Sequence, residues 1–379
     1  MKIIIDSKIP FIKGALEKVG EVIYLAGNKI GPDDVKDADA LIIRTRTICN
    51  RQLLEGSSVK IIATATIGYD HIDTAYCDNA GIRWTNAPGC NSSSVEQYIV
   101  SSLLYLANME GFELTGTTVG IIGVGNVGSK VGRALKALGC KVILNDPPRA
   151  LAEGSDDFSD LDELLEKAHI VTMHVPLAKD GPYKTEGLAD SSFFGKMKEG
   201  ALFINTSRGE VVSEPALKAA MREDKLSGAV LDVFQGEPRV NRELLSMLTI
   251  ATPHIAGYSS DGKANGTTMS VRAVSSFLRL GMDDWEPDNL PVPGDTEIFV
   301  DGDGPEVLDL VTEVYARTYS VQEDHDRFMD NMEQFEALRG GYRIRREPSA
   351  YRVRIFNDDG QYRKIFEGLG FSVIGDSCF

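Results

Sequence analysis

Cysteine is scarce in this sequence: there are five among 379 residues, an odd number, and they are scattered. They lack the short spacings of a metal site or a disulfide framework. We therefore expect reduced thiols in a cytoplasmic protein, and no bound metal. The positions are Cys49, Cys77, Cys90, Cys140 and Cys378.

Long apolar runs are also missing. No stretch approaches the roughly 20 residues that a membrane-spanning helix needs. The N-terminus enters a strand-like run at residues 2–5 and shows no apolar signal with a cleavage site. We expect neither membrane insertion nor a leader sequence.

Basic residues are outnumbered, with 40 Lys and Arg against 56 Asp and Glu, which gives a net charge of −16. This balance argues against a nucleic-acid partner and against an anionic membrane surface. An anionic ligand would need a local cluster of Arg, Lys and backbone N–H groups to overcome the acidic background. Basic residues near a candidate site are therefore informative in this chain.

Two stretches of the sequence alternate short apolar strands with helical patterns, which is typical of parallel sheets joined by crossover helices. The expected strands are 3–6, 22–25, 40–44, 61–66 and 82–85 in the first stretch, and 119–124, 141–145, 170–174, 201–205, 229–232 and 250–252 in the second. Long helices are expected at 92–108, between the stretches, and at about 260–280, after the last strand. We predict an α/β protein in which a Rossmann-type domain, 93–257, is inserted into a flavodoxin-like substrate-binding domain made of 1–92 and 258–284.

The composition changes after Gly281. Three prolines, Pro287, Pro291 and Pro293, indicate a linker. Two helical patterns follow near 304–318 and 324–338, and then strand-like runs at 351–356 and 371–374. We predict a small α+β domain over 285–379.

A glycine pattern lies between the strand at 119–124 and the helical pattern that follows it. Gly123 permits a tight turn, Gly125 lets the backbone approach a pyrophosphate, and Gly128 lets helix pack on strand. The helix N-terminus, with Asn126 and Val127, offers N–H groups and partial positive charge to phosphates. The alternative is a glycine-rich turn without a ligand, but the order of strand, glycines and helix favours a dinucleotide site.

The next strand ends at Asp146, eighteen residues after Gly128. An acid there accepts hydrogen bonds from the adenosine ribose hydroxyls and repels a 2′-phosphate, so NAD is favoured over NADP. The nearby Arg149 weakens this preference for NAD, because an arginine can bind the 2′-phosphate of NADP.

Three polar residues follow expected strands of the second stretch, where ligands gather in open α/β sheets. They are Arg208, Glu237 and His254. A histidine can take the hydroxyl proton when a secondary alcohol is oxidised, a carboxylate can orient the imidazole, and an arginine can hold a substrate carboxylate. Taken singly, Arg208 could instead form a surface ion pair, and Glu237 could belong to a turn before Pro238. His254 could be a core histidine, as His169 and His174 could also be.

The motifs that contain these residues resemble the D-2-hydroxyacid dehydrogenase family. They are the glycine pattern, Asn-Thr-Ser-Arg-Gly at 205–209, Leu-Asp-Val-Phe at 231–234 with Glu237-Pro238, and Thr-Pro-His-Ile-Ala-Gly at 252–257. The resemblance implies catalytic roles for Arg208, Glu237 and His254, and a contact of Asp232 with the nicotinamide carboxamide. Without it, a capping role would be the better interpretation of Asp232. The further cofactor contacts that the resemblance implies are Val175, Thr206, Ser207 and Gly257.

Other motifs resemble one branch of that family. They lie at 64–73, 86–91, 180–185 and 254–258, and the C-terminal segment matches in length and position. The branch oxidises 4-phospho-D-erythronate with NAD in pyridoxal 5′-phosphate biosynthesis and forms homodimers through its C-terminal domain. The resemblance places Thr45, Thr66 and Tyr258 at the substrate. Val175 departs from the branch, in which a threonine is expected.

Two basic residues support a phosphorylated substrate on independent grounds. Arg44 and Arg46 end an expected strand and could bind a phosphate or a carboxylate by charge-assisted hydrogen bonds. The alternative is a solvated loop with incidental charge. The competing functions are another 2-hydroxyacid dehydrogenase, such as one for 3-phosphoglycerate, and a non-enzymatic NADH-sensing corepressor or scaffold.

Overall fold

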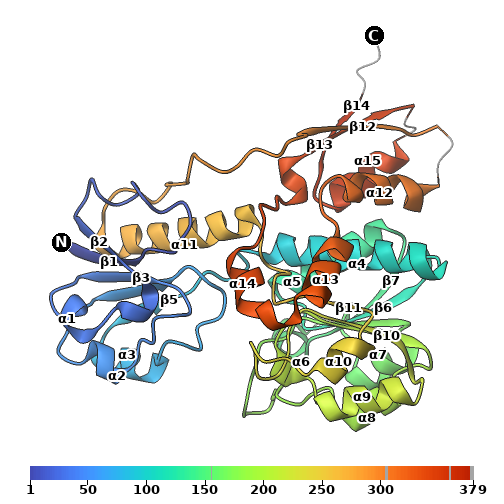
Figure 1. The fold of residues 1–379 in the computed structure, drawn as a ribbon, viewed down its shortest axis with the longest axis horizontal. Helices are drawn as coiled ribbons and strands as arrows, with labels where there is room; N and C mark the ends of the chain where they lie inside the picture. The colour runs from blue at the N-terminus through green and yellow to red at the C-terminus, as the bar shows by residue number, and fades with distance from the viewer. Residues whose placement is uncertain (155, 304–305, 358–359, 376–379) are drawn as a thin grey trace. The chain divides into compact units, whose positions relative to one another are not determined.

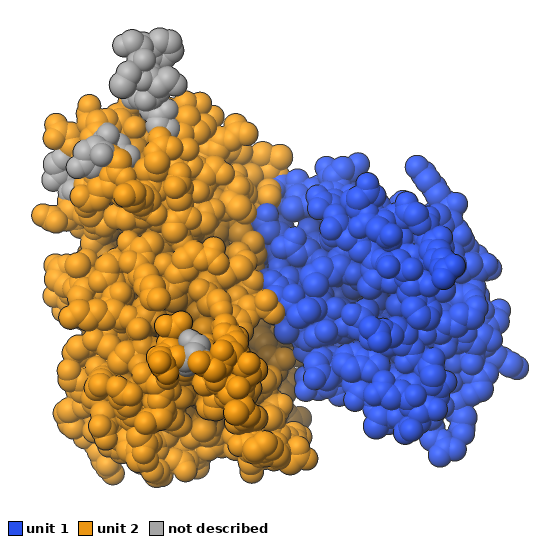
Figure 2. All heavy atoms as spheres, turned by 180° about the vertical axis from the view of Figure 1, so that it is seen from behind, with its two compact units in different colours: residues 1–91, 259–291 blue, residues 92–258, 292–379 orange. Residues whose placement is uncertain are grey.

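The computed structural model describes residues 1–154, 156–303, 306–357 and 360–375. The chain forms two compact units, which Figure 2 shows in blue and orange. Unit 1 comprises residues 1–91 and 259–291, and unit 2 comprises 92–258 and 292–379. Each unit has its own sheets and its own hydrophobic core.

Unit 1 is built on a five-stranded parallel sheet in the order β2-β1-β3-β4-β5. The strands are β1 (Lys2–Asp6), β2 (Glu21–Leu25), β3 (Ala40–Ile43), β4 (Ile61–Thr64) and β5 (Arg83–Thr85). Short helices connect them: η1 (Gly27–Lys29), α1 (Pro32–Val35), α2 (Arg51–Leu54) and α3 (Thr74–Ala80). Every residue of β3 and β4 is buried, as expected for strands covered on two faces. The strand order is that of flavodoxin-like folds, so the predicted class is confirmed.

The long helix α11 (Ser260–Leu278) belongs to unit 1 and lies along its sheet (Figure 1). Its residues Val271 and Val274 share a core with Ile3 and Ile5 of β1. A Cβ atom on Gly266 would stand 2.6 Å from the carbonyl oxygen of Ala65, so only glycine permits this close approach. The sequence predicted the helix but not where it packs.

Unit 2 begins with α4 (Ser92–Glu110) and contains a six-stranded parallel sheet in the order β11-β10-β9-β8-β6-β7. The strands are β6 (Thr118–Ile122), β7 (Lys141–Asn145), β8 (Ile170–Met173), β9 (Ala201–Asn205), β10 (Leu226–Leu231) and β11 (Ile250–Ala251). The helices are α5 (Asn126–Ala137), α6 (Pro147–Glu153), α7 (Leu161–Lys167), α8 (Ser191–Lys196), η2 (Gly209–Val211), α9 (Glu214–Arg222) and α10 (Arg242–Met247). The strand order reverses between β6 and β8, and ligands bind at such a switch point in Rossmann-type sheets. The predicted Rossmann-type class is confirmed.

The C-terminal segment adds a three-stranded parallel sheet in the order β12-β13-β14. Its elements are β12 (Glu297–Asp301), α12 (Val307–Ala316), α13 (Val321–Asp330), η3 (Met332–Gln334), α14 (Phe335–Gly340), η4 (Pro348–Ala350), β13 (Arg352–Phe356), α15 (Gln361–Gly368) and β14 (Ser372–Gly375). The helical pattern predicted from residue 304 therefore begins outside the described residues. Strand β12 was not predicted, because it follows the proline-rich linker directly and alternates buried with exposed residues.

The C-terminal segment shares its core with the rest of unit 2. Val311 and Val314 of α12 belong to the same apolar cluster as Leu103 of α4. On α13, the ring of Phe328 lies 6.3 Å from that of Phe234, which follows β10. Helices α12 and α13 both contact α4 (Figure 1). A chain cut after residue 281 would therefore expose part of the core of unit 2.

Among the described residues, no helix combines the length and the apolar character needed to cross a membrane.

Candidate active site

The glycine loop, residues 123–128, connects β6 to α5. Gly123 has a φ of 85°, and a Cβ on it would stand 2.7 Å from the carbonyl oxygen of His174. A Cβ on Gly128 would stand 2.1 Å from the carbonyl oxygen of Gly123. By contrast, a Cβ on Gly125 would meet no atom within 4 Å. Protein packing therefore explains two of the glycines, and the space over Gly125 at the start of α5 fits a pyrophosphate that approaches the backbone.

The carboxylate of Asp146 lies directly beside the glycine loop. It accepts hydrogen bonds from the N–H of Val124, at 2.8 Å, and from the N–H of Arg149, at 3.1 Å. Each carboxylate oxygen has two lone pairs, so both can still accept from ribose hydroxyls. Asp146 therefore stands where the glycine pattern predicts the ribose-binding acid.

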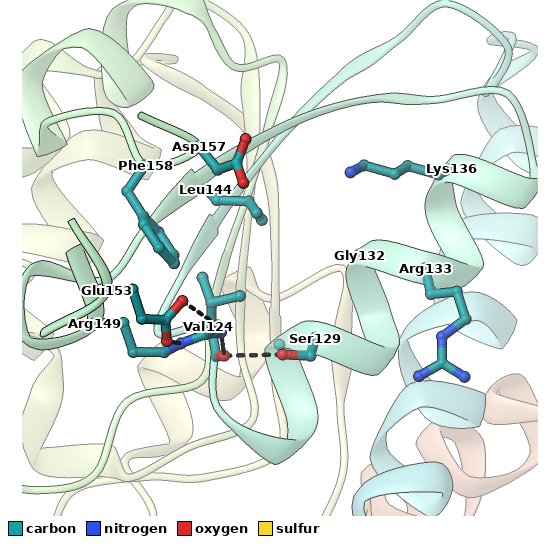
Figure 3. Close-up of a pocket in the computed structure, with 11 residues that line it drawn as sticks. Val124, Ser129, Gly132, Arg133, Lys136, Leu144, Arg149, Glu153, Asp157 and Phe158 are labelled. Carbon is teal, nitrogen blue, oxygen red and sulfur yellow. Dashed lines mark hydrogen bonds and ion pairs between the residues drawn. The ribbon is translucent and has the colours of Figure 1, made fainter. Parts of the chain in front are cut away.

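The positive charge of Arg149 is largely compensated within the protein. Its guanidinium pairs with Glu153 at 2.6 Å and donates to the carbonyl oxygen of Val124 at 2.6 Å. Figure 3 shows this pair beside a cavity of about 360 Å³ that is lined by α5 and by residues Asp157 and Phe158. Arg149 is therefore a weaker candidate for binding the 2′-phosphate of NADP, because its charge is already paired with Glu153.

The two loops that follow β10 and β11 bring Glu237 and His254 together. The Nδ1 atom of His254 lies 2.7 Å from the Oε2 atom of Glu237, and the Oε1 atom accepts the N–H of Phe234 at 2.9 Å. Desolvation by burial favours a higher pKa for Glu237, but the hydrogen bond and charge of His254 and the Phe234 N–H leave that pKa lowered. Glu237 is therefore an ionised acceptor that directs the proton to Nδ1, so that Nε2 of His254 can act as a base.

His254 has a φ of 57°, which is unusual for a residue with a side chain. Such a conformation costs about 1–3 kcal/mol and persists only where neighbouring contacts fix it. It lies in the loop formed by residues 252–258, which we call the catalytic loop after the role that the sequence predicts for His254. The direction of the imidazole therefore depends on what holds this loop.

Asp232, which is 1% exposed, holds the catalytic loop from one side. Its carboxylate accepts the N–H groups of Ile255 and Ala256 at 2.7 and 2.9 Å, and the hydroxyl of Thr252 at 2.7 Å. Because Thr252 donates to Asp232, the buried Tyr98 hydroxyl must donate to Thr252, at 2.8 Å. Burial raises the pKa of Asp232 to about 6, although these bonds and the charge of His254 oppose the rise. Asp232 therefore bonds to the loop as a capping acid would. A contact with the nicotinamide stays a prediction.

Arg208 follows β9 on a loop that is braced by Asn205. The Asn205 side chain accepts from the N–H and hydroxyl of Ser207, at 2.9 and 2.7 Å, and donates to the carbonyl oxygen of Arg208. A Cβ on Gly209 would stand 2.0 Å from the carbonyl carbon of Phe234, so this loop presses on the loop that carries Glu237. The Arg208 guanidinium bonds to the Ser207 carbonyl oxygen at 2.8 Å. The sequence motif contained Asn205, but its bracing role was not predicted.

His174 follows β8 and is a structural histidine. Its ring nitrogens face the hydroxyls of Thr172 at 3.1 Å and Thr206 at 3.4 Å. Desolvation by burial lowers the pKa of His174 to about 3, so the ring is neutral. The predicted cofactor contact Thr206 is therefore a partner of this ring, and the predicted contact Val175 packs beside Gly123.

At the other end of the catalytic loop, Gly257 precedes Tyr258, which contacts the C-terminal segment. The Tyr258 ring lies 6.1 Å from the ring of Tyr342, and the Arg339 guanidinium lies 5.4 Å from its centroid. These contacts were not predicted. The resemblance of the segment 254–258 gave no indication of what Tyr258 packs against.

In unit 1, a chain of hydrogen bonds fixes the predicted substrate residue Thr66. Its hydroxyl donates to the carbonyl oxygen of Gly68 at 2.9 Å, so Thr64 must donate to Thr66, at 2.7 Å. His71 must then donate from Nε2 to Thr64, at 3.1 Å. Burial lowers the pKa of His71. The proton of Thr66 is thus already used, and its Oγ1 presents a lone pair.

The remaining predicted substrate residues lie after β3. Thr45 and Arg46 are exposed, and the partly exposed Arg44 donates from Nη1 to the carbonyl oxygen of Lys8 at 2.6 Å. Their contact with a substrate stays a prediction. In the described parts of the chain, no group of three or more His, Cys, Asp and Glu side chains could hold a metal ion.

Comparison with known proteins shows the class to which this chain belongs. Residues 95–256 match the family described as D-isomer specific 2-hydroxyacid dehydrogenase, NAD binding domain. Among solved structures, a D-lactate dehydrogenase from Aquifex aeolicus in complex with NAD and lactic acid is 28% identical. It superposes with a TM-score of 0.61 and covers 74% of this chain and 96% of its own. The NAD⁺-bound 3-phosphoglycerate dehydrogenase of Entamoeba histolytica is 27% identical, with a TM-score of 0.63 over 77% of this chain and 99% of its own. The fold and site define an NAD-dependent dehydrogenase of 2-hydroxy acids.

Relatives over nearly the whole chain narrow this class. An erythronate-4-phosphate dehydrogenase of Bacteroides fragilis is 50% identical over 360 residues, which is 94% of this chain and 99% of the relative. One from Escherichia coli is 42% identical over 379 residues, which is 99% of both chains. The chain therefore belongs to the erythronate-4-phosphate dehydrogenase family.

Proposed function

We propose that this enzyme oxidises 4-phospho-D-erythronate at C2 to (R)-3-hydroxy-2-oxo-4-phosphooxybutanoate in pyridoxal 5′-phosphate biosynthesis. The observation that best supports this reaction is the Glu237–His254 pair, with Nδ1 and Oε2 2.7 Å apart, in the same unit as the glycine loop. The names of relatives that are 42–50% identical over nearly the full chain support this substrate.

In the proposed reaction, Nε2 of His254 takes the proton of the C2 hydroxyl while Glu237 holds the proton on Nδ1. Bound NAD supplies the acceptor for the hydride that leaves C2. The electron pair of the broken O–H bond then forms the C2 carbonyl, and the proton stays on His254. Arg208 binds the substrate carboxylate and polarises the C2 oxygen, for which it must leave the Ser207 carbonyl.

The cofactor contacts that we propose are made by unit 2 alone. The glycine loop with Asn126 and Val127 binds the pyrophosphate, and Asp146 binds the adenosine ribose. Asp232 is proposed to contact the nicotinamide carboxamide. The proposed neighbours of the cofactor are Val175, Thr206, Ser207 and Gly257.

For the substrate phosphate we propose Arg44 and Arg46 as ligands, with Thr45, Thr66 and Tyr258 nearby. Residues 1–92 and 258–284 would then be the substrate-binding domain, 93–257 the NAD-binding domain and 285–379 the dimerisation domain. Cys49, Cys77, Cys90 and Cys140 are buried free thiols, which supports a location in the reducing cytoplasm.

The test is NAD reduction with a panel of 2-hydroxy acids, with and without a 4-phosphate and including 3-phosphoglycerate. We expect the highest kcat/KM with 4-phospho-D-erythronate. Equal activity on non-phosphorylated acids would contradict the substrate, preference for 3-phosphoglycerate would favour that alternative, and no turnover with any acid would favour an NADH-sensing scaffold.

Substituting Arg44→Ala tests the phosphate assignment. We expect KM for the phosphorylated acid to rise far more than KM for NAD, because a charge-assisted bond is lost. The matched control is Arg51→Ala in the same unit, where an exposed arginine pairs with Glu55 at 2.6 Å. Unchanged KM for the phosphorylated acid in Arg44→Ala would rule out this phosphate contact.

We also propose that a second copy of this chain binds the open face of the C-terminal sheet. Phe299 and Phe356 are 50% and 41% exposed, and their stacked rings lie 6.2 Å apart on this face. The alternate residues of β12 and β13, such as Val300 and Val353, are buried in the core of unit 2.

Sedimentation of a Phe299→Ser, Phe356→Ser double variant tests this interface. A dimeric wild type and a monomeric variant are expected. A variant that remains a stable dimer would contradict the proposal. Truncation after residue 281 is not a usable test, because it removes buried residues of unit 2 such as Val311 and Val314.

A further inference from the structure

The carbonyl side of the catalytic loop is bound by an arginine from the C-terminal segment. Arg345 donates to the carbonyl oxygen of Ala256 at 3.0 Å and to that of Ile255 at 3.5 Å. The N–H groups of the same two residues donate to Asp232. These two residues, directly after His254, are therefore held by an anion on the N–H side and by a cation on the carbonyl side.

Arg345 is itself rigidly seated. It is 3% exposed, and its guanidinium carbon lies 4.0 Å from the centroid of the Tyr319 ring. Its Nε donates to Oε1 of Gln97 on α4 at 2.9 Å, and its Nη2 also donates to the Ser94 carbonyl oxygen. A guanidinium has five donors in a fixed plane, so it can bind several carbonyl groups at once, which an ammonium cannot do.

The two residues that follow Arg345 are also bound to α4. Gln97 uses the other end of its amide to donate to the carbonyl oxygen of Arg346 at 3.1 Å. The Ser94 hydroxyl donates to Glu347 at 2.7 Å. Residues 345–347 are thus fixed to the start of α4, and Arg345 reaches from there to the catalytic loop.

We propose that Arg345 is a positioning residue for His254, and that the C-terminal segment completes the active site of its own subunit. The left-handed backbone of His254 is followed directly by the two residues that Asp232 and Arg345 bind. Loss of the arginine would free the carbonyl side of this loop, and the imidazole would lose its alignment with Glu237. This role is separate from the proposed subunit contact, because it is carried out within one chain.

The inference rests on the proposed role of His254 as the base, so the experiment includes His254→Asn. Full-length Arg345→Ala is compared with Arg343→Ala, which removes a guanidinium two residues away that pairs with Glu323 and Asp324. Steady-state NAD reduction is measured with the 2-hydroxy acid that the wild type oxidises fastest. We expect kcat of Arg345→Ala to fall on the order of tenfold to a hundredfold, as misplaced catalytic groups do.

Two further readouts separate positioning from general loss of structure. KM for NAD should change far less than kcat, because the glycine loop, which is proposed to bind the pyrophosphate, is fixed by its own packing. Guanidinium ion, well below denaturing concentrations, should restore part of kcat in Arg345→Ala by entering the vacated site, but not change kcat in Arg343→Ala. Wild-type kcat in Arg345→Ala, or a loss that Arg343→Ala shares and guanidinium does not relieve, would overturn the inference.

If Arg345→Ala does not fold, Gln97→Met carries the test. This substitution leaves Arg345 in place and removes the acceptor of its Nε. We expect a smaller fall in kcat and little change in KM for NAD. Wild-type kcat in Gln97→Met would overturn the inference. If His254→Asn retains wild-type kcat, the proposed function fails. If His254→Asn is inactive while Arg345→Ala is fully active, only the present inference fails.

Discussion

The glycine loop and the catalytic loop both follow parallel strands of the unit 2 sheet, yet they are held in different ways. The glycine loop is fixed by close backbone packing. Gly128 packs against the carbonyl oxygen of Gly123, and Gly123 packs against the carbonyl oxygen of His174. The catalytic loop is fixed by charged and hydrogen-bonding side chains from distant parts of the chain. A site for a common cofactor can thus be built from one local motif, whereas the orientation of a single imidazole requires several separate segments.

The two loops also use histidine differently. His174, beside the glycine loop, faces two threonine hydroxyls and is neutral, with its pKa lowered to about 3. His254 faces a carboxylate, and its second nitrogen is the one that we propose takes the substrate proton. The position after a strand is common to both residues, so the partner and not the position distinguishes the proposed base from a structural histidine.

The largest expected effect comes from removing the proposed base, His254. His254→Asn should lower kcat by on the order of 10²–10⁴-fold, the range for loss of a general base, with KM for NAD little changed. Glu237→Gln should give a smaller loss in the same direction, because the ring loses the anion that orients it. Steady-state kinetics measure both.

The control for this comparison is His169→Asn. His169 accepts the N–H of Thr118 at 3.2 Å and lies 2.6 Å from Lys198, away from both loops. A kcat loss in this variant as large as in His254→Asn would show that the effect is not specific to the catalytic loop.

The second prediction sharpens the description of the glycine loop. Gly128→Ala should destabilise the cofactor-free protein by about 1–3 kcal/mol, because its Cβ would lie 2.1 Å from a carbonyl oxygen. Gly125→Ala should leave the urea midpoint unchanged, since its Cβ meets nothing within 4 Å, but should raise KM for NAD about tenfold, which corresponds to 1.4 kcal/mol. The pair separates a glycine needed for packing from one needed for a ligand. Equal loss of stability in both variants would refute this separation.

The same contrast explains what could be predicted from the sequence. The strands, the glycine loop and Asp146 are encoded within a few dozen consecutive residues, where periodicity and glycine spacing carry the information. Arg345 lies 89 residues from Ala256 and 248 from Gln97 in the sequence. No local pattern distinguishes it from the neighbouring Arg343 and Arg346, so its role appears only when the chain is folded.

Asp232 shows an intermediate case. Its motif was identifiable, but its three bonds to the catalytic loop were not, because two of the partners are backbone N–H groups without a sequence signal and the third, the Thr252 hydroxyl, lies 20 residues away. Strand β12 was missed for a related reason: its apolar run, residues 298–300, is only three residues long and closely follows the proline-rich linker, so the local pattern gives little sign of a strand.

The effect expected to be smallest at neutral pH is a pH dependence from the histidine beside the glycine loop. The pKa of His174 is about 3 in the folded protein and near 6.5 when unfolded, so below pH 6.5 the unfolded chain binds the proton and the folded chain does not. Stability that is fully present above pH 6.5 is therefore lost as the pH falls, by up to about 1.4 kcal/mol per pH unit from this residue. His174→Gln keeps a hydrogen-bonding group but does not titrate, so its free energy of unfolding should fall less steeply between pH 6.5 and 5. Urea unfolding at several pH values measures the two slopes, and equal slopes would mean that His174 is not the neutral structural residue that distinguishes this loop from the catalytic one.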